Sequence, residues 1–588
     1  MPCPDAEPLY FGSDATPLFG WLHRSPPEVG GALGLLLCNP FGFEEVCAHR
    51  SLRHLAQAAA AAGVPALRFD YPGCGNSAGT DREPGRLAAW VASVHTAVEA
   101  LRAATGVSRV ALFGIRLGAA LAALAASERD DIAGLIAWAP VLSGRAYLRE
   151  LRLLGETLDS SGRSMPVDPA LFESAGFGLA PDAVAAIEAI DLRRLPRRPA
   201  PRVLLVPRDD LPGGADWRAA LEQAGAAVTE AAWLGYAALM TDPQRAELPQ
   251  RLITGTLDTL RDWRGDAAPA PTRPLGRPSV GLAQPAGALR ETVVGIDAGG
   301  TRLFGVLSTP AEGVARCGVL MLNSGSVHHI GPNRLWVELA RDWAARGIAV
   351  LRLDLSGLGD SPPWPGAAEN IVYSPHAASD IAAAIAWLRA LPGIEDCRLL
   401  GLCSGAYHAF KAAVAGQPIE RCVAVNPLTF FWDPRWVVNE GLRDYEPLDA
   451  LVRYRRLALS GRSWRRLLAG ELDLPAIGRM LRRRTTLLAR GMATALARGI
   501  GLPLREDLAR ELARACDRPR RLHFVFSNGD PGLTLLRLQG GRAVRQLLDS
   551  GRLTLALIDG ADHTFTRRAG RAQLVRQLDS LMGLDTPP

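Results

Sequence analysis

The sequence predicts an α/β protein with two tandem domains, each a mostly parallel sheet with helices on both faces. Its 588 residues exceed one ordinary core, and a composition of 48% hydrophobic and 21% charged residues is typical of globular proteins. Two long segments run through the same series of motifs in the same order. Within each segment apolar strands alternate with amphipathic helices, which indicates parallel pairing through right-handed crossovers.

The opening motifs of the two segments correspond element by element. FGSDATPLFGWLHRSP (11–26) matches VGIDAGGTRLFGVLSTP (294–310), and each predicts a hairpin strand. LGLLLCNPFGFE (33–44) matches CGVLMLNSGSVH (317–328), and each predicts a buried strand followed by a loop.

The later motifs keep the same order. The segment 49–79 matches 333–363 as an amphipathic helix, a glycine turn, an apolar strand and a glycine-rich loop. RVALFGIRLGAALAALAA (109–126) then matches CRLLGLCSGAYHAFKAA (397–413) as a strand, a turn and a buried helix.

A segment rich in Pro, Ala and Gly separates the two copies. DAAPAPTRPLGRPSVGLAQPAGA has no apolar periodicity and is typical of a semi-extended linker. We therefore predict a first domain over residues 1–263, a linker over 264–290 and a second domain over 291–588.

Composition excludes several classes of protein. The net charge is only +6 and no long Lys/Arg block occurs, so nucleic acid is a poor candidate partner. The nine cysteines are odd in number and irregularly spaced, which indicates a reducing compartment, and the N-terminus lacks the pattern of a signal peptide. The most apolar stretch is short and carries Arg116, so we expect no membrane span and a cytoplasmic protein. Neither a metal-ligand cluster nor a dinucleotide fingerprint stands out, so we expect no metal and no cofactor.

The motif G-L-C-S-G at 401–405 is typical of a nucleophile elbow. An apolar strand runs directly into Cys403 and a helix follows, so the turn between them presents the sulfur above the sheet. Gly401 and Gly405 flank the turn because a Cβ at either position would clash. The helix N-terminus favours the thiolate, which is the nucleophilic form of cysteine.

An acid and a base follow later in the chain, each after a predicted strand. RLHFVFSNG leads to Asp530, and RLTLALIDGAD leads to His563. In this hypothesis Asp530 holds the tautomer of His563, which accepts and returns the proton. Asp559, Asp562 and Asp360 are alternative acids, although none follows a strand at the usual place.

Backbone N–H groups are expected to form an oxyanion hole. One donor is Ser404, the residue after the nucleophile, and the other is Ser326 or its neighbour Gly325 in the loop after the early strand. His328 and His329 flank this loop and either contact substrate or are simply solvated.

The first copy has lost this chemistry. Its elbow reads G-I-R-L-G, so Arg116 occupies the nucleophile position, and arginine stays protonated. Asp209 or Asp210 remains at the acid position, while Ala238 stands where the second copy has His563. We predict a pseudohydrolase domain in which Arg116 pairs with Asp209 or Asp210, or grips the carboxylate or phosphate of a ligand.

These motifs resemble the α/β-hydrolase superfamily over nearly the whole chain. The GLCSGA and NSGSVHHIGPNR segments are similar to a Cys-type member of the exosortase A system-associated hydrolases of bacterial polysaccharide loci, and CNPFGFE and GIRLGA are similar to their other member. This family is often described as serine aminopeptidase-like, but Cys403 stands where such a peptidase carries Ser. The resemblance therefore implies acyl chemistry rather than peptidase activity.

A long insertion precedes the strand that leads to Asp530. We predict helical cap segments at about 429–518, with Arg recurring beside Leu over 454–491. The simplest interpretation is a helix with one solvated face and one apolar face over the site. The more specific interpretation is that the Arg-rich segment attracts an anionic or carrier-bound substrate.

The sequence therefore predicts a hydrolase of small-molecule acyl esters or thioesters, acting through an acyl intermediate on Cys403. One alternative is an acyltransferase that uses the same triad with an alcohol or amine acceptor. The other is a non-catalytic binding scaffold, against which the complete set of Cys403, Asp530 and His563 argues.

Overall fold

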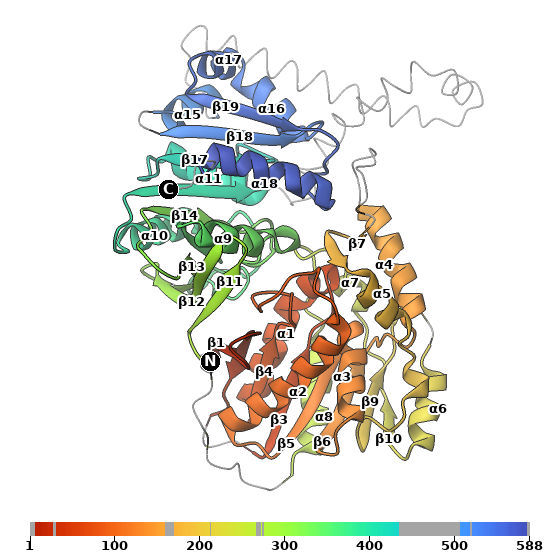
Figure 1. Ribbon diagram of the computed structural model, residues 1–588. Coiled ribbons are helices and arrows are strands. Elements are labelled where there is room, and N and C mark those ends of the chain that lie inside the picture. The colour runs from red at the N-terminus through yellow and green to blue at the C-terminus, as the bar shows by residue number, and fades with distance from the viewer. Residues whose placement is uncertain are drawn as a thin grey trace, which may run out of the picture.

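The computed structural model describes residues 6–26, 31–158, 168, 170–211, 213–265, 272, 276–433, 506–517 and 520–584. These residues form two large sheets, one in the N-terminal half of the chain (6–265) and one in the C-terminal half (276–584) (Figure 1). In Figure 1 the N-terminal half runs from red to yellow and the C-terminal half from green to blue.

The sheet of the N-terminal half has the strand order β1-β2-β4-β3-β5-β6-β9-β10. The pairs β1–β2 and β2–β4 are antiparallel and the others are parallel. The strands are β1 (Ala6–Phe11), β2 (Leu18–His23), β3 (Leu33–Cys38), β4 (Ala66–Phe69), β5 (Arg109–Ile115), β6 (Ile132–Trp138), β9 (Arg202–Val206) and β10 (Ala227–Glu230), with a separate hairpin of β7 (Phe172–Ser174) and β8 (Phe177–Leu179). The helices are α1 (Phe43–Ala61), α2 (Arg86–Thr105), α3 (Leu117–Ser127), α4 (Gly144–Leu158), α5 (Pro181–Glu188), the 3-10 turn η1 (Leu192–Arg194), α6 (Ala215–Gln223), α7 (Tyr236–Leu239) and α8 (Gln250–Trp263).

The sheet of the C-terminal half has the order β11-β12-β13-β15-β14-β16-β17-β18-β19. Its first three pairs are antiparallel and the rest are parallel. The strands are β11 (Ser279–Gln284), β12 (Gly287–Asp297), β13 (Arg302–Pro310), β14 (Cys317–Met321), β15 (Ala349–Leu353), β16 (Asp396–Leu402), β17 (Arg421–Val425), β18 (Arg521–Ser527) and β19 (Leu553–Ile558). The helices are the 3-10 turn η2 (Pro332–Arg334), α9 (Leu335–Ala345), α10 (Ala377–Arg389), α11 (Ser404–Val414), α15 (Leu508–Ala515), α16 (Pro531–Gly540), α17 (Arg542–Asp549) and α18 (Arg568–Met582).

Each sheet buries both faces because its central strands are apolar throughout. In β3, Leu35 and Leu37 pack with α1 and α8 on one face, whereas Leu36 and Cys38 pack with α2 and α3 on the other. In the C-terminal half α9 and α18 cover one face, and α10, α11 and α15 to α17 cover the other. This confirms the predicted fold class, and apart from β11 the two strand orders are the same.

The predicted linker is too long. Residues 279–284 form β11, which pairs with β12 from Gly287 onward, so the C-terminal sheet begins inside the segment 264–290. Val280 supplies the reason, because its side chain is buried in an aromatic cluster between the two halves. Leu282 of the same strand also packs against this cluster, and the Pro/Ala composition of the segment obscured both side chains.

The predicted cap at 429–518 lies mostly outside the described residues, as does its Arg-rich segment 454–491. Its last part is described and is not a cap. Helix α15 buries Leu508 and Leu512 in the core beside α11, so it belongs to the layer of helices that covers the sheet.

The two halves meet along the antiparallel edges of their sheets. The ring centroid of Phe19 in β2 lies 6.5 Å from that of Phe304 in β13, and the ring centroid of Trp21 lies 4.8 Å from that of Phe304. Around this aromatic contact, Arg352 of β15 donates to the side-chain oxygen of Asn76 in the N-terminal half at 2.7 Å. The junction therefore combines apolar packing with buried hydrogen bonds.

No helix among the described residues is long and apolar enough to span a bilayer.

Candidate active site

Cys403 occupies a strained turn between β16 and α11. Its φ of 59° and ψ of −117° are rare for a residue with a side chain, and its N–H donates to the carbonyl oxygen of Val425 at 2.9 Å. The side chain is buried, with 8% of the residue exposed. The neighbouring strand therefore holds the cysteine in place at the first turn of α11.

Both elbow glycines lack room for a side chain. A Cβ at Gly401 would lie 2.1 Å from the carbonyl oxygen of Gly405, and a Cβ at Gly405 would lie 2.5 Å from that of Asn323. Because all of these contacts are with backbone atoms, small side-chain movements could not relieve them. The glycines thus permit the close approach of strand, turn and loop that the sequence pattern predicts.

The structure brings Asp530 and His563 together. The imidazole Nδ1 lies 2.7 Å from Oδ2 of Asp530, whose side chain is almost fully buried. The other carboxylate oxygen accepts the N–H of Gly532 at 2.9 Å, which fixes the carboxylate at the start of α16. With Nδ1 held as the donor, Nε2 of His563 is the nitrogen available for proton transfer.

Cys403 is the neighbour of this pair. Burial alone would lower the pKa of His563, but the Asp530 carboxylate and a Cys403 thiolate together raise it well above its usual range. The Cys403 sulfur acts on the pKa of His563 through its charge and as a side-chain hydrogen-bond partner, and Nε2 of His563 is buried with no other partner among the described residues. The three side chains therefore form one electrostatic unit.

The alternative acids are engaged elsewhere. Oδ1 of Asp562 accepts the N–H of Thr566 at 2.8 Å. Asp559 accepts the side-chain amide of Asn528. Asp360 lies at the junction between the halves, where Arg68 donates to it at 2.9 Å. Only Asp530 among these four acids bonds to His563 in the described structure.

The loop after β14 approaches the elbow through one hydrogen bond. The N–H of Gly325 donates to the hydroxyl of Ser404 at 2.9 Å, so this N–H is occupied. The hydroxyl of Ser326 is buried and has no partner among the described residues. Of the two loop donors that the sequence suggests, the arrangement favours the N–H of Ser326.

His328 and His329 are buried, so the interpretation that they are simply solvated is wrong, while substrate contact stays a prediction. Nδ1 of His329 bonds to Asp354 at 2.8 Å, and its Nε2 bonds to Asn76 of the N-terminal half at 2.8 Å. The ring of His328 stacks on that of His49 at 4.0 Å. Three residues after Gly325, which contacts the elbow, the loop packs against the N-terminal half at the junction. No local sequence pattern predicts this contact.

Two groups among the described residues have the composition of a metal site, and both lie at this junction. The first contains Glu45, His49 and His328, and the second contains His328, His329 and Asp360. The rings of His49 and His328 are within 14° of parallel, so their in-plane lone pairs do not converge on one ion. Both nitrogens of His329 are already hydrogen-bonded. We therefore assign no metal to these residues.

An aromatic group beside the nucleophile was missed by sequence reasoning. Burial and the charge of a Cys403 thiolate raise the pKa of Tyr373 well above its usual range, which marks this phenol as a neighbour of the sulfur. The Tyr373 ring stacks on Trp432 at 4.1 Å and meets Tyr407 edge-on at 5.1 Å. Tyr373 lies in an irregular loop, where no periodicity could have predicted its position.

Arg116 has the same backbone geometry as Cys403 but different partners from those predicted. Its φ of 55° and ψ of −123° place it at the start of α3. Its guanidinium pairs with Glu44 at 2.7 Å and with Glu150, and it lies over the rings of Tyr147 and Tyr236. The site is therefore filled from within the protein.

The predicted pairing of Arg116 with Asp209 or Asp210 is wrong. Asp209 accepts the N–H of Gly235 at 2.7 Å, and Asp210 pairs with Arg208 at 2.7 Å. Asp210 is paired within its own loop and Asp209 bonds to the loop after β10, so Glu44, from the first turn of α1, reaches the guanidinium instead. Ala238 lies on the short helix α7 and offers no base.

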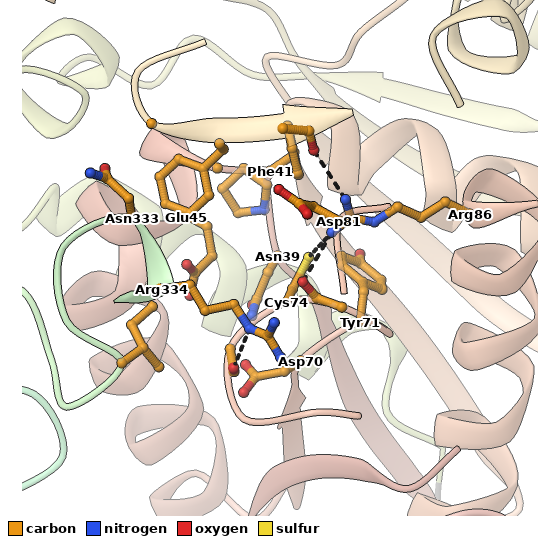
Figure 2. Close-up of a pocket in the computed structure, with 18 of the residues that line it drawn as sticks. Asn39, Phe41, Glu45, Asp70, Tyr71, Cys74, Asp81, Arg86, Asn333 and Arg334 are labelled. Atoms are coloured by element: carbon orange, nitrogen blue, oxygen red, sulfur yellow. Dashed lines mark hydrogen bonds between the residues drawn. The ribbon is translucent and has the colours of Figure 1, made fainter. Parts of the chain in front are cut away.

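A small cavity of about 30 Å³ lies between the halves, away from this site (Figure 2). Arg334 enters it from the C-terminal half and Arg86 from the N-terminal half. Both guanidinium groups donate to backbone carbonyls, those of Gly75 and Gly178 among them. Cys403, Asp530 and His563 do not line this cavity, which is part of the junction.

The strand order, the strained elbows and the residues after β18 and β19 define the α/β-hydrolase fold. A family model described as serine aminopeptidase, S33, matches residues 42–188, which include Arg116 but not Cys403. Est1E from Butyrivibrio proteoclasticus with bound ferulic acid is similar at 18% identity, covering 43% of this chain and 97% of that chain, with a TM-score of 0.33.

Two further solved structures are similar at lower scores. An esterase from Pyrococcus furiosus has 13% identity over 50% of this chain and 90% of its own, with a TM-score of 0.30. A dienelactone hydrolase from Anabaena variabilis has 13% identity over 50% of this chain and 97% of its own, with a TM-score of 0.28. No curated protein matches this chain.

Proposed function

We propose that the C-terminal half is a hydrolase of carboxylic esters or thioesters that works through an acyl intermediate on Cys403. The observation that carries the proposal is the hydrogen bond from His563 to the buried Asp530, in an electrostatic unit with a cysteine held at a strained elbow. Structural cysteines have no need of such a neighbour, because burial alone makes them inert.

The proposed reaction has two steps. His563 takes the Cys403 proton, and the thiolate attacks the substrate carbonyl to form a C–S bond. The C–O or C–S bond to the leaving group breaks, and His563 protonates the departing alcohol or thiol. A water molecule then gives its proton to His563 and attacks the thioester, which releases the carboxylic acid and restores the Cys403 thiol.

The oxyanion of each tetrahedral intermediate needs two N–H donors. We assign these to the backbone of Ser404, at the first turn of α11, and to the backbone of Ser326. The hydrogen bond from the Gly325 N–H to the Ser404 hydroxyl supports this choice, because it holds the loop close to the elbow and occupies the alternative donor.

We also propose that the chain contains tandem copies, that the first domain is a pseudohydrolase over residues 1–263, and that the second begins at β11 and not at residue 291. The shared strand order and the matching backbone angles of Arg116 and Cys403 support this proposal. Arg116 is bonded to Glu44 and Glu150, which supports a structural role for the first copy over ligand binding at that point.

Intact-mass spectrometry of the full chain tests the enzymatic proposal. Wild type and Cys403→Ala are incubated with a panel of acyl esters and acyl thioesters, with Cys422→Ala, a buried cysteine of β17, as the matched control. We expect an acyl-sized mass gain on wild type and Cys422→Ala but not on Cys403→Ala. Full turnover by Cys403→Ala would contradict the mechanism.

The same experiment separates the alternatives. Acyl transfer to an added alcohol or amine, with little release of free acid, would identify an acyltransferase that uses the same intermediate. The resemblance of the GLCSGA and NSGSVHHIGPNR segments to exosortase A system-associated hydrolases supports including glycan hydroxyls among the acceptors. Absence of any adduct or product across the panel would favour the binding scaffold.

The proposed location is the cytoplasm. The cysteines that the structure describes are all unpaired, which supports a reducing compartment.

A further inference from the structure

Gln244 of the N-terminal half lies against the loop that we assign to the oxyanion hole. An ideal Cβ built on Gly325 would lie 2.9 Å from Nε2 of Gln244 and 3.1 Å from its Cδ. The space that a side chain at position 325 would use is therefore filled by a side chain from the other half of the protein. Gly325 also has a φ of 58°, which favours glycine independently.

The corresponding position in the N-terminal half is built differently. Phe41 matches Gly325 in the aligned segments, and its ring packs on Trp90 at 5.4 Å and on Phe177 at 6.2 Å, all within one half. The C-terminal half has no such residue of its own at this point in the loop. Gln244 supplies the missing side chain there, and it is polar where Phe41 is apolar.

Local hydrogen bonds fix the Gln244 segment in place. The N–H of Gln244 donates to Asp242 at 2.8 Å, and the side-chain amide of Asn370 donates to the carbonyl oxygens of Pro243 and Gln244 at 3.3 and 3.2 Å. Three residues after Asn370, the same loop reaches Tyr373, the neighbour of Cys403. Gln244 is therefore linked to the proposed active site in two ways, through its contact with Gly325 and through the loop that carries Asn370 and Tyr373.

The side-chain carboxamide of Gln244 takes no part in these hydrogen bonds, which involve its backbone. Its side-chain atoms make no hydrogen bond among the described residues, and the residue is only partly buried. A polar side chain that is pinned by its backbone but free at its tip is able to bind a group that arrives from solution.

We propose that Gln244 contacts the substrate and sets its specificity in the active site of the C-terminal half, so that this site is completed by the other half of the chain. The inference rests on the proposed function of Cys403. Because Nε2 lies nearest to Gly325, the side chain offers N–H donors to an oxygen carried by the substrate close to the scissile carbonyl. The preferred substrates are therefore esters or thioesters with an oxygen-bearing acyl group.

A pair of isosteric esters tests this inference on the full-length protein. p-Nitrophenyl methoxyacetate and p-nitrophenyl butyrate differ only in an ether oxygen in place of a methylene. For wild type, Gln244→Met and the exposed control Gln250→Met, we would measure kcat/KM for both esters and the rate at which iodoacetamide alkylates Cys403.

We expect the ratio of kcat/KM for methoxyacetate to that for butyrate to fall about tenfold in Gln244→Met, as for loss of one hydrogen bond to substrate, with alkylation unchanged and Gln250→Met like wild type. An unchanged ratio in an enzyme that still forms acyl-Cys403 would overturn the inference and leave the proposed function standing. An equal fall in kcat/KM for both esters, together with slower alkylation of Cys403, would mean that Gln244 only shapes the loop. That result would also overturn the inference. Failure of wild type to acylate with any ester would remove the proposed function and this inference together.

Discussion

Arg68 and Asp360 form a buried ion pair across the junction between the two halves. The guanidinium donates to the carboxylate at 2.9 Å, and both side chains are nearly inaccessible to solvent. In the matched segments Arg352 corresponds to Arg68 and Asn76 corresponds to Asp360, and these two are also bonded, at 2.7 Å. The junction therefore repeats one contact in both directions, as a two-fold interface does.

Removing the carboxylate of this pair should destabilise the whole protein. Asp360→Ala leaves the Arg68 charge buried without compensation, which typically costs about 3–5 kcal/mol. Urea unfolding followed by circular dichroism measures the loss. Asp258→Ala is the control because its pair with Arg261 is exposed, and it should cost less than about 1 kcal/mol. Equal effects of the two variants would show that the junction pair has no special role.

Replacing the acid of the triad should impair turnover without unfolding the protein. Asp530→Asn still accepts the N–H of Gly532 through its amide oxygen, but it no longer raises the pKa of His563 or fixes its tautomer. We expect kcat to fall by about 10²- to 10⁴-fold with ester substrates. Asp559→Asn, on a neighbouring loop, should retain activity, and the opposite ranking of the two variants would assign the acid to Asp559.

Arg116 should matter for stability and not for turnover. Arg116→Met leaves Glu44 buried without its partner and should cost about 3–5 kcal/mol in the free energy of unfolding. Adding Glu44→Gln removes that charge, so the double variant should recover much of the loss. Ester hydrolysis at a temperature where each variant is folded should equal that of wild type. A loss of turnover in the folded double variant would give the N-terminal site a catalytic role.

The junction should make stability depend on pH through Glu45. Burial first, and then the charges of Asp70 and Asp360, raise the pKa of Glu45 to about 8. The folded state thus retains a proton that the unfolded state releases near pH 4.5, so this group lowers stability as pH rises from about 4.5 to about 8.

The Tm of Glu45→Gln should therefore fall less between pH 6 and pH 9 than the Tm of wild type does. Differential scanning calorimetry at several pH values measures the two slopes, and Glu247→Gln serves as an exposed control. Parallel curves for wild type and Glu45→Gln would show that Glu45 ionises normally in the folded protein.

The elbow should not accept a methyl group. A Cβ at Gly405 meets the carbonyl oxygen of Asn323 at 2.5 Å, so Gly405→Ala must move the loop that carries Ser326. We expect a loss of at least about 2 kcal/mol in stability and a marked loss of esterase activity. Gly281→Ala is the control because a Cβ there meets nothing within 4 Å. Normal activity of Gly405→Ala would show that the elbow tolerates this shift.

The fold and much of the candidate site could be predicted because their signals are local. The elbow glycines, the apolar strand before Cys403 and the strand ends at Asp530 and His563 lie within short segments whose backbone demands particular residues. The mostly parallel pairing follows from the alternation of strands and helices, whereas the strand order comes from the structure. The structure shows that, of the four acids that the sequence offers, Asp530 bonds to His563.

The partners of Arg116, the burial of His328 and the position of Gln244 could not be predicted. Each depends on a contact between residues distant in the chain, such as Arg116 with Glu44 or Gln244 with Gly325. A histidine on a loop looks the same in sequence whether water or another domain covers it. Val280 shows the same effect, since its burial at the junction, like the pairing of β11 with β12, is invisible in the linker-like composition of the segment.

The paired contacts at the junction also bear on how the chain has been able to change. In a dimer of identical subunits every substitution appears twice, so losing a nucleophile in one subunit loses it in both. Here both sides of the interface are encoded along one polypeptide, and corresponding positions already differ, as Arg116 does from Cys403 and Asn76 from Asp360. Such an arrangement allows one half to lose catalysis and keep a structural role, as we propose for the half that carries Arg116, and allows a side chain such as Gln244 to act on the other half alone.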